Sequence, residues 1–153
     1  MKMRIAGIVN DSIVDGPGIR MTIFVQGCPH HCPGCHNPQS HDFAGGQEMD
    51  TADIIERMDS NPLLDGITLS GGEPFEQCEG CMILAKAARE RGLNVWAYSG
   101  YTLEHLMEIP EKKQLLKECD VLVDGPFILA ERSLNLRFRG SKNQRIIELK
   151  TVL

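Results

Sequence analysis

Three cysteines lie within eight residues of one another, in the stretch CPHHCPGCHN at residues 28–37. Cys28, Cys32 and Cys35 are separated by four and three positions, and histidines stand beside them. Thiolates are soft ligands that suit zinc and iron–sulfur clusters. A closed zinc site takes four ligands, whereas a disulfide joins two cysteines. Three thiols therefore indicate either a missing partner or a metal with one coordination position left open.

Four kinds of site fit this stretch to different degrees. The segment 32–36, CPGCH, matches a haem-attachment pattern, and CPGC alone resembles a thioredoxin-type redox pair, but both leave Cys28 unexplained. Zinc would take Cys28, Cys32, Cys35 and His36, although structural zinc sites usually combine two separate ligand pairs. A [4Fe-4S] cluster held by only three thiolates would keep one iron open to an outside ligand, and the spacing favours this interpretation.

Length and charge limit the class of protein. A chain of 153 residues predicts one domain, over 1–153, and is short of the roughly 250 residues of a complete eight-unit α/β barrel. The net charge of −5 argues against a nucleic-acid partner held mainly through its phosphates. Neither an apolar run of membrane-spanning length nor a secretory signal is visible, so we expect a cytoplasmic protein. In that compartment the six cysteines are more often ligands, catalytic groups or core residues than disulfides.

The elements that must position these residues alternate along the chain. Strand-like stretches followed by helix-like stretches predict βαβ units, and so an α/β fold built on a parallel sheet. Four to six such units would give an open, partial (β/α) barrel-like sheet rather than a closed barrel. Strands are expected at 20–26, 66–70, 94–99, 121–125 and 145–149, and helices from 50 or 51 to 58, over 75–91, and from 102 to 118 with a break near Pro110.

This arrangement places the cysteines at the carboxyl end of the first strong strand. The second strand ends at Gly71, Gly72 and Glu73. In open α/β sheets and in barrels, the loops after the carboxyl ends of the strands carry the ligand chemistry. The two loops therefore predict one shared site.

The cysteine spacing resembles the C-x-x-x-C-x-x-C motif of the radical S-adenosylmethionine superfamily, with a match at every position from Cys28 to Cys35. The resemblance implies that the three thiolates hold a [4Fe-4S] cluster and that S-adenosylmethionine chelates the fourth iron. One electron from the cluster would then release a 5′-deoxyadenosyl radical. In that superfamily a GGE stretch after the second strand binds the methionine amino end, which implies this role for residues 71–73.

Further motifs resemble one particular family within this superfamily. Residues 15–20, DGPGIR, are similar to a D-G-P-G-x-R segment of glycyl-radical activating enzymes. Residues 123–127, VDGPF, and 139–145, RGSKNQR, resemble the family that activates anaerobic (class III) ribonucleoside-triphosphate reductases. This implies abstraction of a hydrogen atom from a glycine of the reductase, with flavodoxin or a similar protein as electron donor. The alternatives are an activase of the pyruvate formate-lyase type and a non-enzymatic iron–sulfur electron-transfer module.

The resemblance also implies roles for individual side chains. His36 and Asn37 would approach the adenine or support the cluster, and Glu73 would recognise the amino group together with the backbone of its loop. Ser99 would contact the carboxylate or ribose of the cofactor. Asp124, at the end of the following strand, would contact the cofactor or a bound cation. All of these residues lie at or after the carboxyl ends of four predicted strands.

Arginines in the motifs have two interpretations. Arg20, Arg139 and Arg145 either contact the reductase or are ordinary surface residues.

A second C-x-x-C, at Cys78 and Cys81, has a simpler interpretation than a metal site. These cysteines recur with Met82 and Ala85 at the spacing of one helix face. Because a free cysteine behaves as a small hydrophobic residue, we expect Cys78, Cys81 and also Cys119 to pack in the core.

Overall fold

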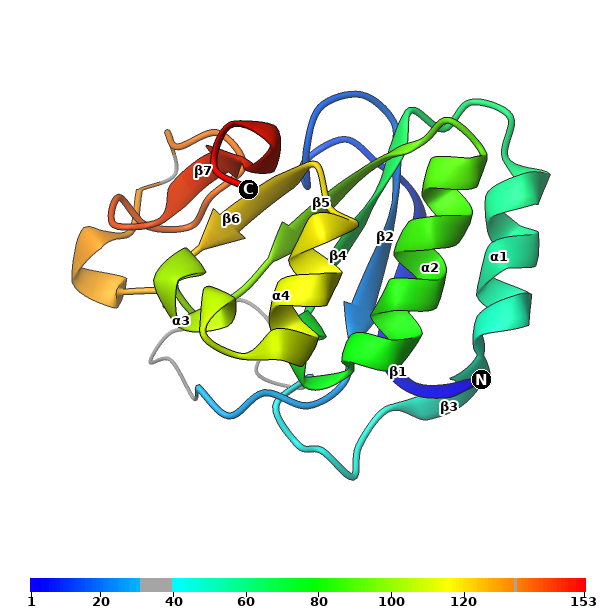
Figure 1. Ribbon diagram of the computed structural model, residues 1–153, viewed down its shortest axis with the longest axis horizontal. Coiled ribbons are helices and arrows are strands. Elements are labelled where there is room, and N and C mark those ends of the chain that lie inside the picture. The colour runs from blue at the N-terminus through cyan, green and yellow to red at the C-terminus, as the bar shows by residue number, and fades with distance from the viewer. Residues whose placement is uncertain (31–39, 134) are drawn as a thin grey trace.

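The computed structural model describes residues 1–30, 40–133 and 135–153, and these form a seven-stranded sheet in the order β3-β1-β2-β4-β5-β6-β7 (Figure 1). The strands are β1 Lys2–Ser12, β2 Arg20–Val25, β3 Gln47–Asp50, β4 Gly66–Gly71, β5 Asn94–Tyr98, β6 Val121–Asp124 and β7 Arg145–Glu148. The helices are α1 Thr51–Ser60, α2 Cys78–Glu90, α3 Leu103–Met107 and α4 Pro110–Lys117, with short 3-10 turns at Pro74–Glu76, Leu129–Glu131 and Leu149–Thr151.

The α/β class is as predicted, but the sheet is mixed rather than wholly parallel. Strands β2, β4, β5 and β6 run parallel, as expected. Strand β1 is antiparallel to β2 and to β3, and β7 is antiparallel to β6. The physical reason lies in the connections. A short loop joins β1 to β2, and the described residues between β6 and β7 form no α-helix. A parallel pairing needs a longer crossover, which is usually helical.

Most predicted elements are present with small shifts. Helix α1 begins after Asp50, whose carboxylate accepts a hydrogen bond from the amide of Ala52 at 3.0 Å. The predicted break near Pro110 separates α3 from α4. The predicted helix over 75–91 is divided, because a 3-10 turn precedes α2. The sequence analysis did not predict β1 or β3, whose burial patterns lack the regular alternation of a half-buried strand.

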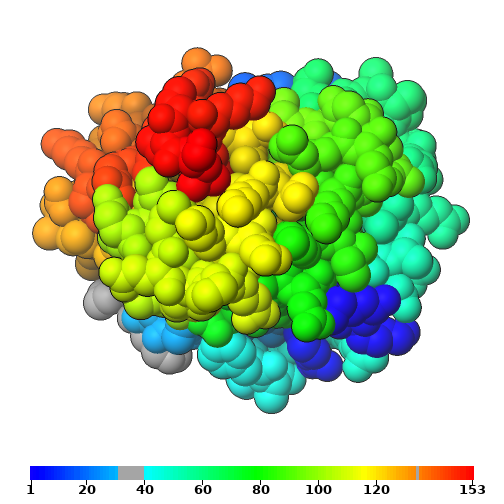
Figure 2. Space-filling model, viewed as in Figure 1, coloured from blue at the N-terminus to red at the C-terminus, as the bar shows by residue number. Residues whose placement is uncertain are grey.

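Helices α1, α2 and α4 lie on the same face of the sheet (Figure 1). Side chains on a strand alternate between faces, so Met21, Ile23 and Val25 of β2 enter the helix-covered core, and Phe24 points to the other face. The helices and the C-terminal turn cover the core side of the molecule (Figure 2). No helix within the described residues is long and apolar enough to span a membrane.

Arg20 lies on the face opposite the helices and is fully buried, so the expectation of a surface or partner-binding arginine was wrong. Its guanidinium donates to the Thr68 hydroxyl at 2.8 Å, to the Ile67 carbonyl at 2.7 Å and to the Pro17 carbonyl at 3.0 Å. Burial lowers its pKa to about 10, so the group is still charged at neutral pH. Arg20 thus fastens the loop before β2 to β4.

Replacing Arg20 by alanine is expected to destabilise the fold by about 3–5 kcal/mol, because the change leaves a cavity and unpaired carbonyls. Urea unfolding followed by circular dichroism measures this. The control is Arg57→Ala on the exposed side of α1, which should change stability by less than about 0.5 kcal/mol. Equal stabilities of the two variants would contradict the structural role of Arg20.

Candidate active site

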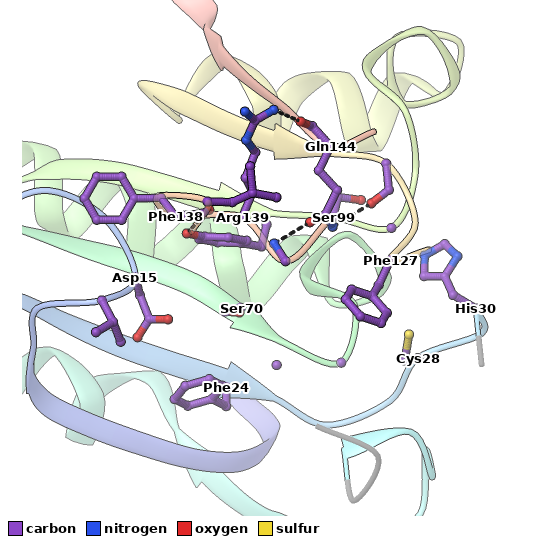
Figure 3. Close-up of a pocket in the computed structure, with 18 of the residues that line it drawn as sticks. Asp15, Phe24, Cys28, His30, Ser70, Ser99, Phe127, Phe138, Arg139 and Gln144 are labelled. Atoms are coloured by element: carbon purple, nitrogen blue, oxygen red, sulfur yellow. Dashed lines mark hydrogen bonds between the residues drawn. The ribbon is translucent and has the colours of Figure 1, made fainter. Parts of the chain in front are cut away.

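A cavity of about 330 Å³ lies on the face of the sheet opposite the helices, at the carboxyl ends of the parallel strands (Figure 3). Its size is within the range of small-molecule sites. Cys28 and His30 lie toward one end and Asp15 and Phe138 toward the other. The lining comes from the strand ends, the loop before β2 and the segment after β6, and includes Val14, Asp15, Phe24, Cys28, His30, His41, Ser70, Gly71, Gly72, Tyr98, Ser99, Gly100, Phe127, Phe138, Arg139 and Gln144.

Of the predicted cluster ligands, only Cys28 belongs to the described residues. It is 7% exposed and lines the cavity, directly after β2 as predicted. Its amide donates to the carbonyl of His41 at 3.1 Å, which holds the start of the cysteine stretch against the chain that returns from it. Cys32, Cys35, His36 and Asn37 lie outside the described residues.

The glycine loop after β4 packs against the backbone that leads into Cys28. The amide of Gly72 donates to the Val25 carbonyl at 2.9 Å, and the amide of Glu73 donates to the Gly27 carbonyl at 2.7 Å. A Cβ atom at Gly72 would lie 2.4 Å from the Gly27 carbonyl oxygen. Gly71 adopts a positive φ of 107°, which favours glycine. The two predicted loops are therefore in direct contact.

Glu73 lies behind this loop and is fully buried. Within the described residues, its carboxylate accepts hydrogen bonds from the Phe75 amide at 3.2 Å, the Gly100 amide at 2.8 Å and the Ser99 hydroxyl at 2.9 Å. His30 Nε2 lies 2.7 Å from Oε1. An ionised carboxylate has about four acceptor positions. The chain itself can fill them, which favours a supporting role for the Glu73 side chain over direct contact with a ligand.

Ser99 lies beside Glu73 at the cavity wall. Its hydroxyl donates to Glu73 and accepts from the amide of Tyr101 at 3.0 Å. These contacts fix the turn after β5, and Ser99 as a ligand contact stays a prediction.

Asp124 is buried but is not part of the cavity lining. Its carboxylate accepts from the Leu103 amide at 2.7 Å, at the start of α3, and from Arg145 Nε at 2.9 Å. Arg145 also pairs with Glu104 at 2.8 Å, and this hydrogen bond lowers the pKa of Glu104 to about 2. These contacts join β6, β7 and α3. In the described part of the chain, no group of three or more His, Cys, Asp or Glu side chains could hold a metal ion.

The sequence analysis did not identify the residues that close the far side of the cavity. The hydroxyl of Tyr98 donates to the Phe138 carbonyl at 2.7 Å, and the ring of Phe138 packs edge-on against Trp96 at 5.4 Å. Arg139 donates to the carbonyl of Gln144 at 2.8 Å. Sequence signals for this wall were available, because Tyr98 lies near the end of the predicted strand 94–99 and Arg139 belongs to the RGSKNQR motif.

Comparison with known proteins identifies the family. A family model described as a 4Fe-4S single cluster domain matches residues 14–147. The anaerobic ribonucleoside-triphosphate reductase-activating protein of Vibrio cholerae is 37% identical over 142 residues, 88% of this chain and 90% of that protein. Its namesake from Escherichia coli K12 is 36% identical over 146 residues, 90% of this chain and 94% of that protein.

The chain belongs to the family of anaerobic ribonucleoside-triphosphate reductase-activating proteins. The family predicted from the motifs is thereby confirmed, and with it the prediction that the chain is an enzyme, an oxidoreductase. A solved structure of QueE from Escherichia coli shares the fold, with a TM-score of 0.50 over 67% of this chain and 54% of that chain at 15% identity.

The cysteines outside this site are core residues, as predicted. Cys78, Cys81 and Cys119 are buried free thiols, and the Cys78 thiol donates to the Phe75 carbonyl at 3.0 Å. Burial raises the pKa of Cys78 to about 12 and raises the pKa of the other two as well. Such thiols form little of the reactive thiolate at neutral pH.

Iodoacetamide at mildly alkaline pH is therefore expected to leave Cys78, Cys81 and Cys119 unmodified in the folded protein. Peptide mass mapping before and after unfolding in guanidinium chloride measures the labelling. The unfolded chain is the control, in which all three should react. Rapid labelling of any of them in the folded protein would contradict their assignment to the core.

Proposed function

We propose that this protein activates the anaerobic ribonucleotide reductase by radical S-adenosylmethionine chemistry. The observation that carries the proposal is that Cys28 and the glycine loop at Gly71 and Gly72 line the same cavity. Cys32 and Cys35, seven residues or fewer further along, would complete the set of three thiolate ligands. The match to a 4Fe-4S cluster domain over residues 14–147 supports the proposal.

The described residues fit these groups chemically. A cysteine thiolate is the usual ligand of an iron–sulfur cluster, and the Cys28 side chain lies at the cavity. Gly71 and Gly72 line the cavity, and the positions that their Cβ atoms would occupy are filled by the backbone of Val25 and Gly27. Glycine therefore lets this loop pack directly against the segment that leads into Cys28. When bound, the cluster and S-adenosylmethionine would supply the one-electron radical chemistry by which a hydrogen atom is removed from a glycine Cα of the reductase.

The task of the chain's own residues is to orient the cofactor and exclude water. The backbone of residues 71–73 would bind the methionine amino end, with the Glu73 side chain holding that backbone in place. Ser99 would keep the neighbouring turn in position. Because its O–H donates to Glu73, its oxygen could only accept a further hydrogen bond, as from a ribose hydroxyl, and a contact to the carboxylate would require that bond to be exchanged. His36 and Asn37 would lie near the adenine. Asp124 would not touch the cofactor directly. Its carboxylate accepts a hydrogen bond from the Leu103 amide and so would hold the start of α3 in place.

The wall formed by Phe24, Phe127 and Phe138 would keep water from the reacting atoms.

The protein partner would be the reductase, since relatives of this chain are named as its activating proteins. Flavodoxin or a similar protein would supply the electron.

Three further expectations stay predictions: the single domain over 1–153, the partial-barrel curl of the sheet and the cytoplasmic location.

The direct test is electron paramagnetic resonance of the protein reconstituted anaerobically with iron and sulfide and reduced with dithionite. We expect a [4Fe-4S]⁺ signal that changes when S-adenosylmethionine is added, with 5′-deoxyadenosine as product. Cys32→Ala should abolish both, because one of three ligands is lost. Adding purified anaerobic reductase should then give a glycyl-radical signal.

Other outcomes would identify the alternatives. A cluster signal that does not respond to the cofactor would support an electron-transfer module. Tightly bound zinc without a cluster would refute the proposal. A glycyl radical on pyruvate formate-lyase, but not on the reductase, would reassign the partner.

A glycine substitution tests the role of the backbone. In Gly72→Ala the new Cβ would lie 2.4 Å from the Gly27 carbonyl oxygen and must displace the loop. We expect binding of S-adenosylmethionine to weaken roughly tenfold or more, since small displacements cost much in an oriented site. Equilibrium dialysis measures the affinity. The control is Gly7→Ala, where a Cβ meets nothing within 4 Å; equal affinities would contradict the role of the loop.

A further inference from the structure

His30 lies within the cysteine stretch, two residues after Cys28. Its Nε2 atom is 2.7 Å from Oε1 of Glu73, and the two side chains are 16% and 0% exposed. Because an ionised carboxylate only accepts hydrogen bonds, the tautomer that fits this contact is the one with the proton on Nε2. A hydrogen bond to a charged group out of water is stronger than one between neutral groups. The described start of the cysteine stretch, residues 28–30, is therefore fastened by a side chain to the loop after β4.

The ring of His30 is also fixed in orientation. It packs edge-on against Tyr101, with ring centroids 4.5 Å apart and an interplanar angle of 74°. On another side it faces Gly100, where a Cβ atom would lie 2.4 Å from the His30 ring. Only a residue without a side chain at position 100 allows this approach. The ring is thus enclosed by the turn after β5 while it binds the carboxylate from the β4 loop.

We infer that His30 is a positioning residue, which sets the orientation of the Cys28 stretch toward the glycine loop and so aims the cluster at the cofactor. The inference rests on the proposed function. The proposed function assigns the cluster to Cys28, Cys32 and Cys35, and the hydrogen bond that His30 makes is the one from its Nε2 atom to Glu73. It would act through Glu73, whose carboxylate also holds Ser99 and Gly100. Neither motif reasoning nor the comparisons assign a role to this histidine.

The test compares His30→Ala with His30→Gln in the reconstituted protein. Alanine removes the donor, whereas the side-chain amide of glutamine can place an N–H near the position of Nε2. We expect His30→Ala to assemble a normal amount of cluster, because the cysteines are intact. Its affinity for S-adenosylmethionine, measured by titrating the change in the cluster's resonance signal, should fall roughly ten- to a hundredfold. His30→Gln should recover most of this loss.

His105→Ala is the matched control. His105 also stacks on Tyr101, at 4.8 Å, but is exposed. This variant should bind the cofactor as the unmodified protein does. The thermal unfolding of the cluster-free protein should be similar in all variants, which separates positioning from a loss of fold.

Three results would overturn the inference. In the first, His30→Ala binds the cofactor normally. In the second, it no longer retains iron or unfolds at a much lower temperature, so that His30 serves the fold or the cluster itself. In the third, His30→Gln lowers the affinity for S-adenosylmethionine as much as His30→Ala does, so that the hydrogen bond to Glu73 does not contribute to cofactor binding. If the unmodified protein shows no response to the cofactor, the proposed function fails as well; a normal response in both proteins refutes only the role of His30.

Discussion

The buried carboxylate of Glu73 joins loops that follow three neighbouring strands. Its donors are Phe75 in its own loop, Ser99 and Gly100 after β5, and His30 after β2. A carboxylate removed from water is costly unless donors occupy its lone pairs. Because those donors belong to different loops, the loops cannot separate without leaving the charge unsatisfied. The positions of these loops, and therefore the shape of the cavity that they line, depend on this one group.

The two faces of the sheet have different roles: one packs the apolar core and the other lines the cavity. One face packs apolar side chains such as Ile23 and Leu69 under the helices. On the other face the described residues form no layer of helices, and there the guanidinium of Arg20 joins β2 to β4 through buried hydrogen bonds. The chain between β6 and β7 completes the second face, since Tyr98 holds the Phe138 carbonyl. The antiparallel return of β7 thus brings the RGSKNQR motif to the cavity that begins at the cysteines.

Local features of the chain were readable from the sequence. The parallel strands β2, β4, β5 and β6 follow short β-rich runs, each ending near its predicted boundary. The cap at Asp50 and the break at Pro110 depend on side chains within a few residues of the element. Strands β1 and β3 were missed, because their side chains alternate irregularly in burial. The family and the order of its motifs were also determined at this level, because spacing along the chain is itself the signal.

The partners of the charged residues were decided only by the tertiary structure. Arg20 was expected at the surface but lies fully buried, and Asp124 was expected at a ligand but pairs with Arg145. Glu73 was expected to bind a cofactor, yet its acceptor positions face the chain's own donors, including a histidine 43 residues away. Such contacts form because the sheet sets the strand ends side by side. A hydrogen bond across that distance leaves no periodic pattern in the sequence, so only the packing of the whole fold determines it.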